Sequence, residues 1–420
     1  NFQLDATNVK YDVQAIFTCL FPQRNEVPYH RTWPIGSLIT HHLKSSIGLT
    51  DTVTIIRRNT RQAREFGELF GNTIRVEHHG IPSVSTGYFC QIPNPTHSHS
   101  TVAQESSEDV IDSLIVTMKT YHTFPMMRML SSRLTSASTI VLLQTGMGVY
   151  DELVQRIFHD PRERPNFILA TSTHKAYTNN DLADIVHTQA GELTFGIVPN
   201  ETNKDFDAGF HDESVSLFDR KGRLSDIVSS PSDPYYNRFK TLRDTVETLL
   251  KMKSLNPSWK SLPEIQTTLR CNLTLRSVVD PLTALLNCRN GQLLHSPSLR
   301  TITRRVTNEA SRVFAAEIDA HLKMANSSDD DDEDGAWHAS LPPKLQPLSL
   351  EEDVLKYLLD TKGHISPMLA DIRGGKPTEI LNLNGHLLKM ASQYRLYVPW
   401  TAQLLELVQM RSGIPLDQML

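Results

Sequence analysis

The chain has 420 residues, 39% hydrophobic and 21% charged, and a formal net charge of −5. The acidic run DDDDED at residues 329–334 accounts for that charge, so the remainder is close to neutral. No apolar run approaches the roughly eighteen residues of a membrane helix, and four scattered cysteines without CxxC spacing predict neither a disulfide framework nor a zinc site. These totals exclude a membrane-spanning protein and a globally basic nucleic-acid-binding protein, and they predict two globular domains.

The first half of the chain alternates short apolar strands with helical stretches. β-branched runs joined by helices are typical of a parallel, doubly wound sheet. We expect one amphipathic helix at 34–46 and strands at 11–21, 52–58, 112–119, 138–148, 166–174 and 191–199.

From about residue 235 the apolar period changes to that of helices. The segments 239–253, 262–287 and 299–324 read as helices, and three or four more follow. The sequence therefore predicts an α/β domain at 1–205, a linker at 206–234 and an all-helical domain at 235–420.

Two polar tracts interrupt this pattern. Residues 94–109 and 326–344 are too polar to pack, so we expect surface inserts, the second of them acidic and disordered. An acidic tail that contacts a partner is the alternative for the second tract.

The stretch RTWPIG stands where a dinucleotide-binding domain would have GxGxxG. Gly36 keeps the third glycine, which lets the helix pack on the strand, whereas Arg31 and Trp33 replace the first two. A bulky indole at the second position occupies the place where backbone approaches the pyrophosphate. The pattern predicts that the structural part of the motif is kept and the ligand-binding part is lost.

Several strings, in order, resemble ketopantoate reductase, a two-domain NADPH enzyme family that reduces a 2-keto acid. They are VTMKTYHT (116–123), TGMGVYDEL (145–153), ATSTHKA (170–176) with GELTFG (191–196), VVDPLTALLNCRNGQLL (278–294) and ISPMLADIRGGKPTEILNLNGHLLKMA (365–391). The resemblance covers roughly residues 28 to 412. It implies a Rossmann-like domain followed by an all-helical domain with a 6-phosphogluconate-dehydrogenase-like C-terminal architecture.

The catalytic positions of that family carry over poorly. The family has Lys, Asn and Asn at i, i+4 and i+8 before PLTA, where this chain has Asn272, Arg276 and Asp280. Asn272 cannot act as a general acid near neutral pH. Arg276 and Asp280 are four residues apart on a helix, so we expect them to pair.

A second catalytic stretch is also incomplete. The family's serine, twelve residues before the glutamate of TEI, is replaced by Pro367, and Ser366 is displaced by one residue. Glu379 is retained, and the alternative role for it is a helix-surface or salt-bridged carboxylate.

Some cofactor-side residues are retained. Arg57 and Arg58 follow the second strand, where a 2′-phosphate of NADP would bind, and Lys119 matches the family's cofactor-side lysine. Gly146 and Gly148 match its GMG turn, and Thr145 replaces the preceding asparagine. Each has a structural alternative: charges on a solvated rim, or turn glycines. We interpret His174 as a hydrogen-bonded structural histidine and His97 with His99 as no metal site.

Three functional hypotheses follow. The joint losses favour a pseudoenzyme that keeps the fold as a binding or scaffold subunit without a cofactor, so that the family activity is not expected. The alternative is an active NADP-dependent 2-dehydropantoate 2-reductase or a related 2-keto acid reductase.

The third hypothesis names a partner. A scaffold of this kind would belong to a larger assembly, such as the mitochondrial ribosome or an mRNA-handling complex. RNA would then contact the helix surface that carries Arg300, Arg304, Arg305 and Arg312, and a solvated helix face is the alternative. Because the chain begins at Asn1, we expect a processed mitochondrial protein, with the cytoplasm as the alternative location.

Overall fold

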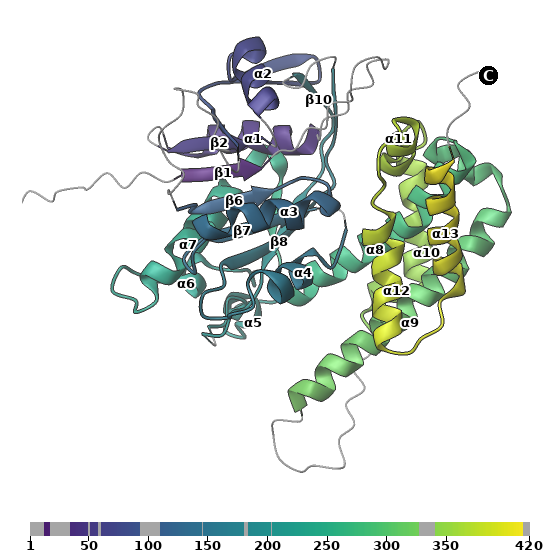
Figure 1. Ribbon diagram of the computed structural model, residues 1–420. Coiled ribbons are helices and arrows are strands. Elements are labelled where there is room, and N and C mark those ends of the chain that lie inside the picture. Colours follow the sequence, from purple (N-terminus) through teal and green to yellow (C-terminus); the bar gives the residue numbers. More distant parts are fainter. Residues whose placement is uncertain are drawn as a thin grey trace, which may run out of the picture. The chain divides into compact units, whose positions relative to one another are not determined.

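The computed structural model describes residues 12–16, 34–48, 51–57, 60–92, 110–144, 146–179, 184–202, 204–326 and 341–414. The chain divides into two compact units (Figure 1). The first comprises residues 1–144 and 149–265, and the second comprises residues 145–148 and 266–420. We call them the sheet unit and the helical unit.

The sheet unit is built on a sheet with the order β12-β11-β8-β7-β6-β1-β2-β5. Its strands are β1 Asp12–Ile16, β2 Thr52–Ile56, β5 Phe89–Gln91, β6 Ser113–Val116, β7 Thr139–Leu143, β8 Asn166–Ser172, β11 Leu193–Ile197 and β12 Pro257–Trp259. The pairs from β5 to β8 are parallel, and β11 runs antiparallel to β8. Read from β5 to β8, this is the 3-2-1-4-5-6 order of dinucleotide-binding folds, with the switch point between β1 and β6.

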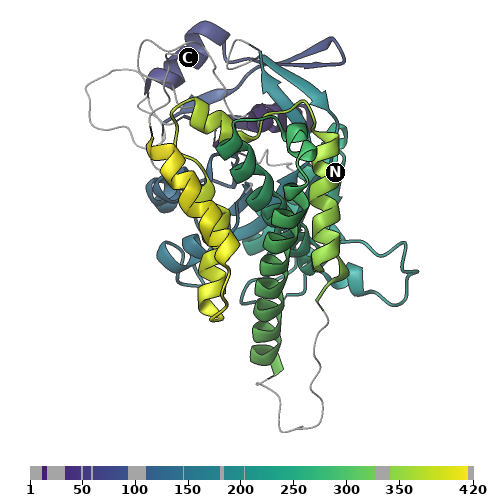
Figure 2. The ribbon, with the colours of Figure 1, turned by 90° about the vertical axis from the view of Figure 1, so that its right-hand side faces the viewer.

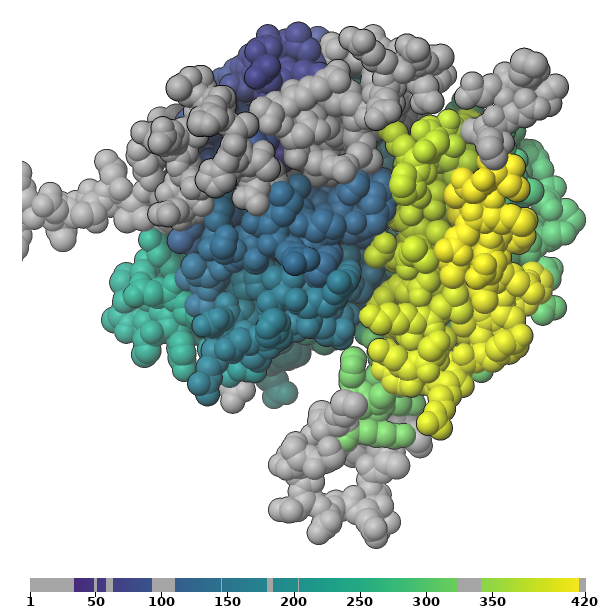
Figure 3. Space-filling view, viewed as in Figure 1, coloured from purple at the N-terminus to yellow at the C-terminus, as the bar shows by residue number. Residues whose placement is uncertain are grey.

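Helices cover both faces of this sheet. Successive side chains of a strand point to opposite faces, so each strand contributes to two hydrophobic cores, one on each face. Ile115 and Val141 pack with α1 Pro34–Ser46 and α7 Tyr236–Lys251, whereas Leu114 and Ile140 pack with α3 Thr120–Leu130 and α4 Val149–Arg156. Figure 3 shows the surface formed by the segment that carries α3 and α4. The remaining helices of the unit are α2 Thr60–Phe70, α5 Ala208–His211 and α6 Leu224–Ile227. The doubly wound α/β prediction is confirmed.

The boundary between the units lies later than predicted. We expected a linker at 206–234 and the helical domain from 235, but residues up to Ile265 belong to the sheet unit. The reason is that α7 buries Phe239 and Leu242 in the sheet core, and the Thr245 hydroxyl lies 2.6 Å from the Ser113 hydroxyl on β6. Helical periodicity shows that a helix buries one face, but not which unit covers it.

A second, four-stranded sheet was not predicted. Its order is β4-β3-β10-β9, with the strands β3 Ile74–His78, β4 Ile81–Ser85, β9 Lys175–Thr178 and β10 Asp184–Gln189. A two-residue turn joins β3 to β4, and both of its residues, His79 and Gly80, have positive φ, as type I′ hairpins require. These strands are short and α1 packs across them, so their burial depends on partners distant in the sequence.

The helical unit contains the long helices α8 Leu262–Leu286, which begins in the sheet unit, and α9 Ser298–Asn326 (Figure 2). Four more come after them, as expected: α10 Pro347–Asp360, α11 Pro367–Arg373, α12 Asn384–Gln393 and α13 Pro399–Gly413. Their apolar faces form shared cores around Phe314, Leu387 and Val408. The all-helical second domain is thus confirmed.

The two polar tracts fall almost entirely outside the described residues. The tract at 94–109 is not described, and neither are residues 327–340 of the second tract. The second tract ends earlier than predicted, because Pro343–Leu345 form a 3-10 turn and Leu345 is fully buried.

Candidate functional site

The carboxyl ends of β2, β6 and β7 lie at one edge of the main sheet. Arg57 comes directly after β2, Lys119 after β6, and the turn 146–148 after β7. These strands are parallel and in register through β1, so the residues at their carboxyl ends emerge at the same edge. In open α/β sheets this is the edge where ligands bind.

Gln144 joins two of these strand ends and was not singled out from the sequence. Its buried amide nitrogen donates to the Met118 carbonyl at 2.7 Å and to the Thr123 hydroxyl at 2.6 Å. These bonds connect the end of β7 to the segment that carries Lys119. A lone glutamine after an apolar run has no sequence signal that reveals such a role.

Arg57 is not part of a solvated rim. Its side chain is 3% exposed, and its guanidinium carbon lies 4.9 Å from the centre of the Phe66 ring on α2. A cation over an aromatic face gains electrostatic stabilisation. The solvated-rim alternative is therefore wrong for Arg57, while Arg58 lies outside the described residues.

Gly36 lies on the buried face of α1, in its first turn. Its carbonyl accepts a hydrogen bond from the Thr40 hydroxyl at 3.0 Å. This burial fits the packing role predicted for the third glycine. Arg31 and Trp33 lie outside the described residues, so the proposed steric block stays a prediction.

The turn 146–148 belongs to the helical unit. Gly148 has φ of +83°, and an added Cβ would lie 2.5 Å from Nδ1 of His386 on α12. Burial, followed by the positive charges of Lys389 and Arg270, lowers the pKa of His386 to about 4. Glycine is thus required at position 148 both by the positive φ and by the close His386 imidazole. Thr145 lies outside the described residues.

The predicted ion pair on α8 is present. Nη1 of Arg276 lies 3.3 Å from Oδ1 and 3.5 Å from Oδ2 of Asp280, and the two side chains are 20% and 5% exposed. Burial opposes the charge of Arg276, but Tyr357, Asp280 and Glu379 outweigh it and raise its pKa. The site therefore holds a fixed positive charge beside a buried carboxylate, one helical turn from Asn272.

Glu379 is one of the groups that act on Arg276. It is 7% exposed and stands just before the 3-10 turn Ile380–Asn382, at the start of the segment that leads into α12. Of the two alternatives for Glu379, the helix-surface carboxylate is wrong, whereas its interaction with Arg276 agrees with a carboxylate engaged by a positive charge. The structure brings Glu379, Arg276 and Asp280 into one polar cluster of the helical unit.

Pro367 and Ser366 have structural roles. Pro367 is the first residue of α11, a position that tolerates the missing N–H. The Ser366 hydroxyl accepts a hydrogen bond from the Leu369 amide at 3.1 Å and one from the Thr283 hydroxyl at 2.7 Å. Ser366 therefore caps α11 against α8 rather than facing a ligand.

Asn384 is a buried polar residue that sequence reasoning missed. It is fully buried at the start of α12, and its Nδ2 donates to the Ser277 carbonyl on α8 at 3.1 Å. This bond ties the segment after Glu379 to the helix that carries Arg276. In the sequence, Asn384 appeared only as part of the LNLNG string of the family resemblance, and nothing in that string predicts that Asn384 is buried.

The histidine interpretations can be compared with the structure. His174 is 4% exposed and hydrogen-bonded to backbone, which confirms its structural role. His97 and His99 lie outside the described residues. Within the part of the chain that is described, no three potential ligand side chains converge as a metal site requires.

The arginines of α9 are exposed, but two of them have partners within the chain. Arg304 pairs with Glu351 on α10 at 3.3 Å, and Arg305 lies 4.8 Å from the ring of Trp400. Arg300 and Arg312 are exposed as well. No described helix combines the length and apolarity that crossing a bilayer demands.

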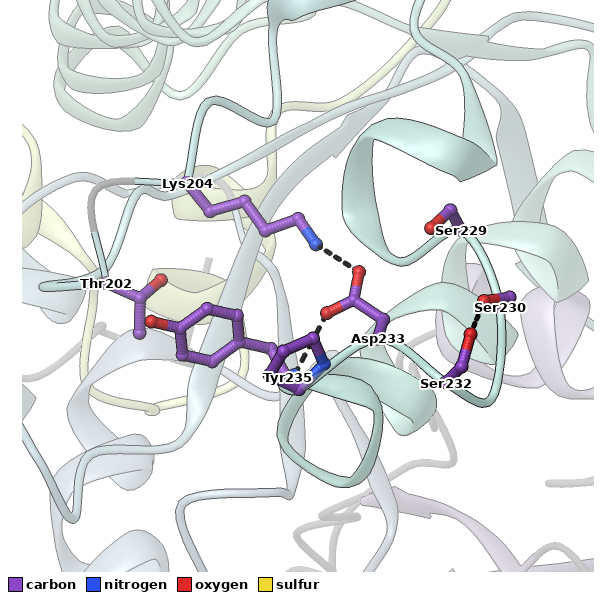
Figure 4. A pocket seen from close by; sticks show the side chains of 8 residues that line it. Thr202, Lys204, Ser229, Ser230, Ser232, Asp233 and Tyr235 are labelled. Carbon is purple, nitrogen blue, oxygen red and sulfur yellow. Dashed lines mark hydrogen bonds and ion pairs between the residues drawn. The ribbon is translucent and has the colours of Figure 1, made fainter.

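A polar pocket of about 510 Å³ lies elsewhere in the sheet unit (Figure 4). Its lysine is engaged, since Lys204 Nζ lies 3.0 Å from Asp233 Oδ2, and the hydroxyls of Ser230 and Ser232 pair at 2.7 Å. The pocket residues Thr202 and Lys204 follow the carboxyl end of β11 in the chain. Because β11 is antiparallel to β8, this end lies beside the amino end of β8. The pocket is thus at the sheet edge opposite Lys119.

Comparisons with known proteins agree with this architecture. The profile "Ketopantoate reductase PanE/ApbA" matches residues 34–200, and "Ketopantoate reductase PanE/ApbA C terminal" matches residues 264–412. The 2-dehydropantoate 2-reductase of Shigella flexneri is 25% identical over 302 residues, which cover 72% of this chain and 75% of that protein.

Two further similarities differ in extent. The ketoisovalerate reductase of Beauveria bassiana is 33% identical over 138 residues, 28% of this chain and 30% of that protein. A D-mandelate dehydrogenase solved with NADH and anilino(oxo)acetate superposes with a TM-score of 0.62 at 13% identity, over 96% of this chain and 98% of that chain. Both family profiles match in the expected order, one on each unit. The chain belongs to the ketopantoate reductase PanE/ApbA family.

Proposed function

We propose that this protein is an NAD(P)-dependent reductase of a 2-keto acid. The observation that carries the proposal is the sheet order, with Lys119 following β6 at the carboxyl edge and the turn 146–148 following β7 in the chain. Relatives named 2-dehydropantoate 2-reductase and ketoisovalerate reductase support it. A bound nicotinamide dinucleotide would supply the hydride.

Residues at the ends of the parallel strands fit such a cofactor. Gly36 lies on the buried face of α1, so the helix packs against the sheet as it does behind a bound pyrophosphate. Gly148 adopts a conformation that side chains rarely adopt. Lys119 and Gly146 would bind on the cofactor side, as the family resemblance implies.

Arg276 is the residue that would bind the substrate carboxylate. Both of its bonds to Asp280 come from Nη1, so Nε and Nη2 still point their N–H groups elsewhere. A guanidinium binds a carboxylate through two parallel N–H donors. Asp280 then orients Arg276, and Glu379 contributes to holding its charge.

The site lacks the family's proton donor for the substrate carbonyl. Reduction of a ketone needs a proton at the carbonyl oxygen, and Asn272 cannot supply it. Water or another group would have to do so, which predicts slow turnover. Restoring a lysine at this position should then raise the rate.

The test is NADPH oxidation in the presence of 2-dehydropantoate or 2-ketoisovalerate, followed by absorbance. We expect weak but saturable turnover, and about a 10²- to 10⁴-fold higher rate in Asn272→Lys. Asn308→Lys adds the same side chain at an exposed position of α9 and should change nothing. Absence of NADPH binding and of turnover in all three proteins would contradict the proposal.

The second candidate is the pseudoenzyme, a scaffold that keeps the fold without the reaction. Asn272 in place of a general acid and the engaged guanidinium of Arg276 favour it. Calorimetric titration with NADPH distinguishes the two, because a scaffold with a blocked pyrophosphate site would show no saturable binding. Saturable micromolar binding together with oxidation of NADPH that depends on the keto acid would rule this candidate out.

A further inference from the structure

Five histidines of the sheet unit gather between α1 and the small sheet. They come from α1, from β3, from β10 and from the segment before β9: His41, His42, His78, His187 and His174. The ring of His187 lies 4.6 Å from that of His78 and 5.1 Å from that of His174, and the rings of His41 and His42 are 5.1 Å apart. We call these five residues the histidine cluster.

Hydrogen bonds fix His174 in its neutral form. Its Nε2 lies 2.8 Å from the Leu255 carbonyl, which can only accept, so Nε2 carries the proton. Its Nδ1 accepts from the Gly191 amide at 3.0 Å and faces Nε2 of His187 at 3.0 Å. A second proton on Nδ1 would face the Gly191 N–H and would break that bond.

A second set of polar contacts connects the cluster to the first turn of α1. His41 Nδ1 lies 2.7 Å from the Ser85 hydroxyl, which is 2.5 Å from the Tyr88 hydroxyl. Tyr88 donates to the Thr40 carbonyl at 3.3 Å, and the Thr40 hydroxyl donates to the Gly36 carbonyl at 3.0 Å. The small sheet therefore holds the helix whose first turn overlaps the end of the RTWPIG motif.

The surroundings of the cluster favour neutral imidazoles. Burial, followed by the other histidines, lowers the pKa of His42 and of His187 to about 4. Burial also lowers the pKa of His41 and of His174. Protonating one member places a charge beside several others in a poorly hydrated site.

Neighbouring charges do not offset this effect. His78 and His187 are paired across β3 and β10 and share the face of Val76 and Ile185, which points into the core. Residues on the opposite face of these strands pair with one another, Arg75 with Glu77 at 4.0 Å and with Asp184 at 3.8 Å. The ring of His79, in the turn after β3, lies 4.1 Å from that of His78. The other charged side chains on α1 and on the elements packed against it are Lys44, Lys175, Arg238, Lys240, Arg243, Asp244, Glu247, Lys251 and Lys253.

We propose that the histidine cluster positions α1 for dinucleotide binding, and that acidification releases α1 and weakens the binding. The inference deepens the proposed function and rests on it for the cofactor. The cluster residues are positioning residues, because they act through α1 rather than on a ligand. Opening of α1 would expose the imidazoles to water and allow them to charge.

The first experiment measures the opening of α1 directly by hydrogen exchange of its amides in the full chain. Between about pH 7.5 and about pH 5.5, we expect protection, corrected for the intrinsic rate, to fall about tenfold for each histidine whose pKa rises from about 4 to 6.5 on opening. In His42→Gln the fall should be about tenfold smaller. His211→Gln, outside the cluster in the same unit, should behave as wild type.

Equal protection of α1 at both pH values, or an unchanged pH effect in His42→Gln, would overturn the inference. His187→Gln provides a second variant, because a glutamine amide can donate or accept and can take the place of His187 Nε2 beside His174 without a titrating group. It should show the same reduced pH effect as His42→Gln. If it keeps the full effect, the cluster is not the cause.

The second experiment titrates NADP⁺ by calorimetry at both pH values. Wild type should lose affinity on acidification, and His42→Gln should lose less. No binding at either pH would overturn the proposed function while the exchange result still decides whether the cluster controls α1. Binding with the same pH dependence in wild type and His42→Gln would overturn the inference and leave the proposed function standing.

Discussion

The carboxyl edge of the main sheet and the polar face of α8 differ in how closely they match the family pattern. The sheet edge has Lys119 and the turn glycines, and Gly148 has no room for a side chain. On α8, by contrast, the expected Lys, Asn and Asn are Asn272, Arg276 and Asp280. At the turn, the positive φ of Gly148 and the close His386 ring allow only glycine. On the partly buried face of α8, other polar side chains can replace the family's residues as long as they form an ion pair, as Arg276 and Asp280 do.

The largest expected effect comes from removing the ion pair between Arg276 and Asp280 on α8. Arg276→Met removes the guanidinium beside a carboxylate that is 5% exposed, so we expect the free energy of unfolding to fall by about 3–5 kcal/mol. Arg64→Met is the matched control, because Arg64 and Glu68 have the same order and spacing but are 69% and 70% exposed. It should cost only about 0.3–0.5 kcal/mol.

Urea unfolding of both variants measures these values. Arg276→Met combined with Asp280→Leu should recover most of the loss, because the buried carboxylate is removed as well. Equal small losses in the two single variants would show that the α8 pair is an ordinary surface pair.

Acid should affect the two units unequally. The pKa values of His42 and His187 in the sheet unit and of His386 in the helical unit are about 4, below the ordinary 6.5. Neutral imidazoles are therefore favoured in the folded state, and their contribution is present above about pH 6.5 and is lost as pH falls toward about 4. At about pH 5 we expect losses of about 2–4 kcal/mol in the sheet unit and about 1–2 in the helical unit, after allowance for partial exposure.

Urea titrations with oxidative footprinting and mass spectrometry would resolve the two units. The sheet unit should unfold at a lower urea concentration in acid, while its midpoint near neutral pH is unaffected by histidine charge. A helical unit that loses as much stability as the sheet unit would contradict this asymmetry.

A glycine in the sheet unit supports the histidine contacts. A Cβ on Gly191 would lie 2.5 Å from the backbone nitrogen of His174, so Gly191→Ala should lower the free energy of unfolding by about 1–3 kcal/mol. Gly363 in the helical unit has nothing within 4 Å of an added Cβ, so Gly363→Ala should stay within about 0.5 kcal/mol. Thermal unfolding of both variants measures the difference, and a neutral Gly191→Ala would show that this strand end can move.

The smallest effect is expected on the arginine face of α9. Arg304→Gln removes a partner of Glu351, but the Arg304 side chain is 63% exposed, so the cost should be at most about 1 kcal/mol. Arg312→Gln, at another exposed position of the same helix, should be neutral. A large loss in Arg304→Gln would mean that this face is part of the fold rather than a surface open to a partner.

Much of the fold was accessible from local patterns. The parallel strands are apolar runs such as TVTII and TIVLL, buried on both faces, and such runs need no distant information to be recognised. The long helices α8 and α9 likewise show their apolar period over many turns. The i, i+4 spacing alone predicted the bond between Arg276 and Asp280.

The rest was decided by residues that are far apart in the sequence. The apolar face of α7 could have packed on the sheet unit or on the helical unit, and only tertiary contacts decided that it packs on the sheet. In the small sheet, β3 and β10 pair although they lie about a hundred residues apart. The burial of Arg57 on Phe66, the approach of Glu379 to Arg276 and the histidine cluster arose in the same way. Local sequence determined which segments were strands and helices, because periodicity is a property of one segment, whereas charge and burial at the site depended on which segments packed together.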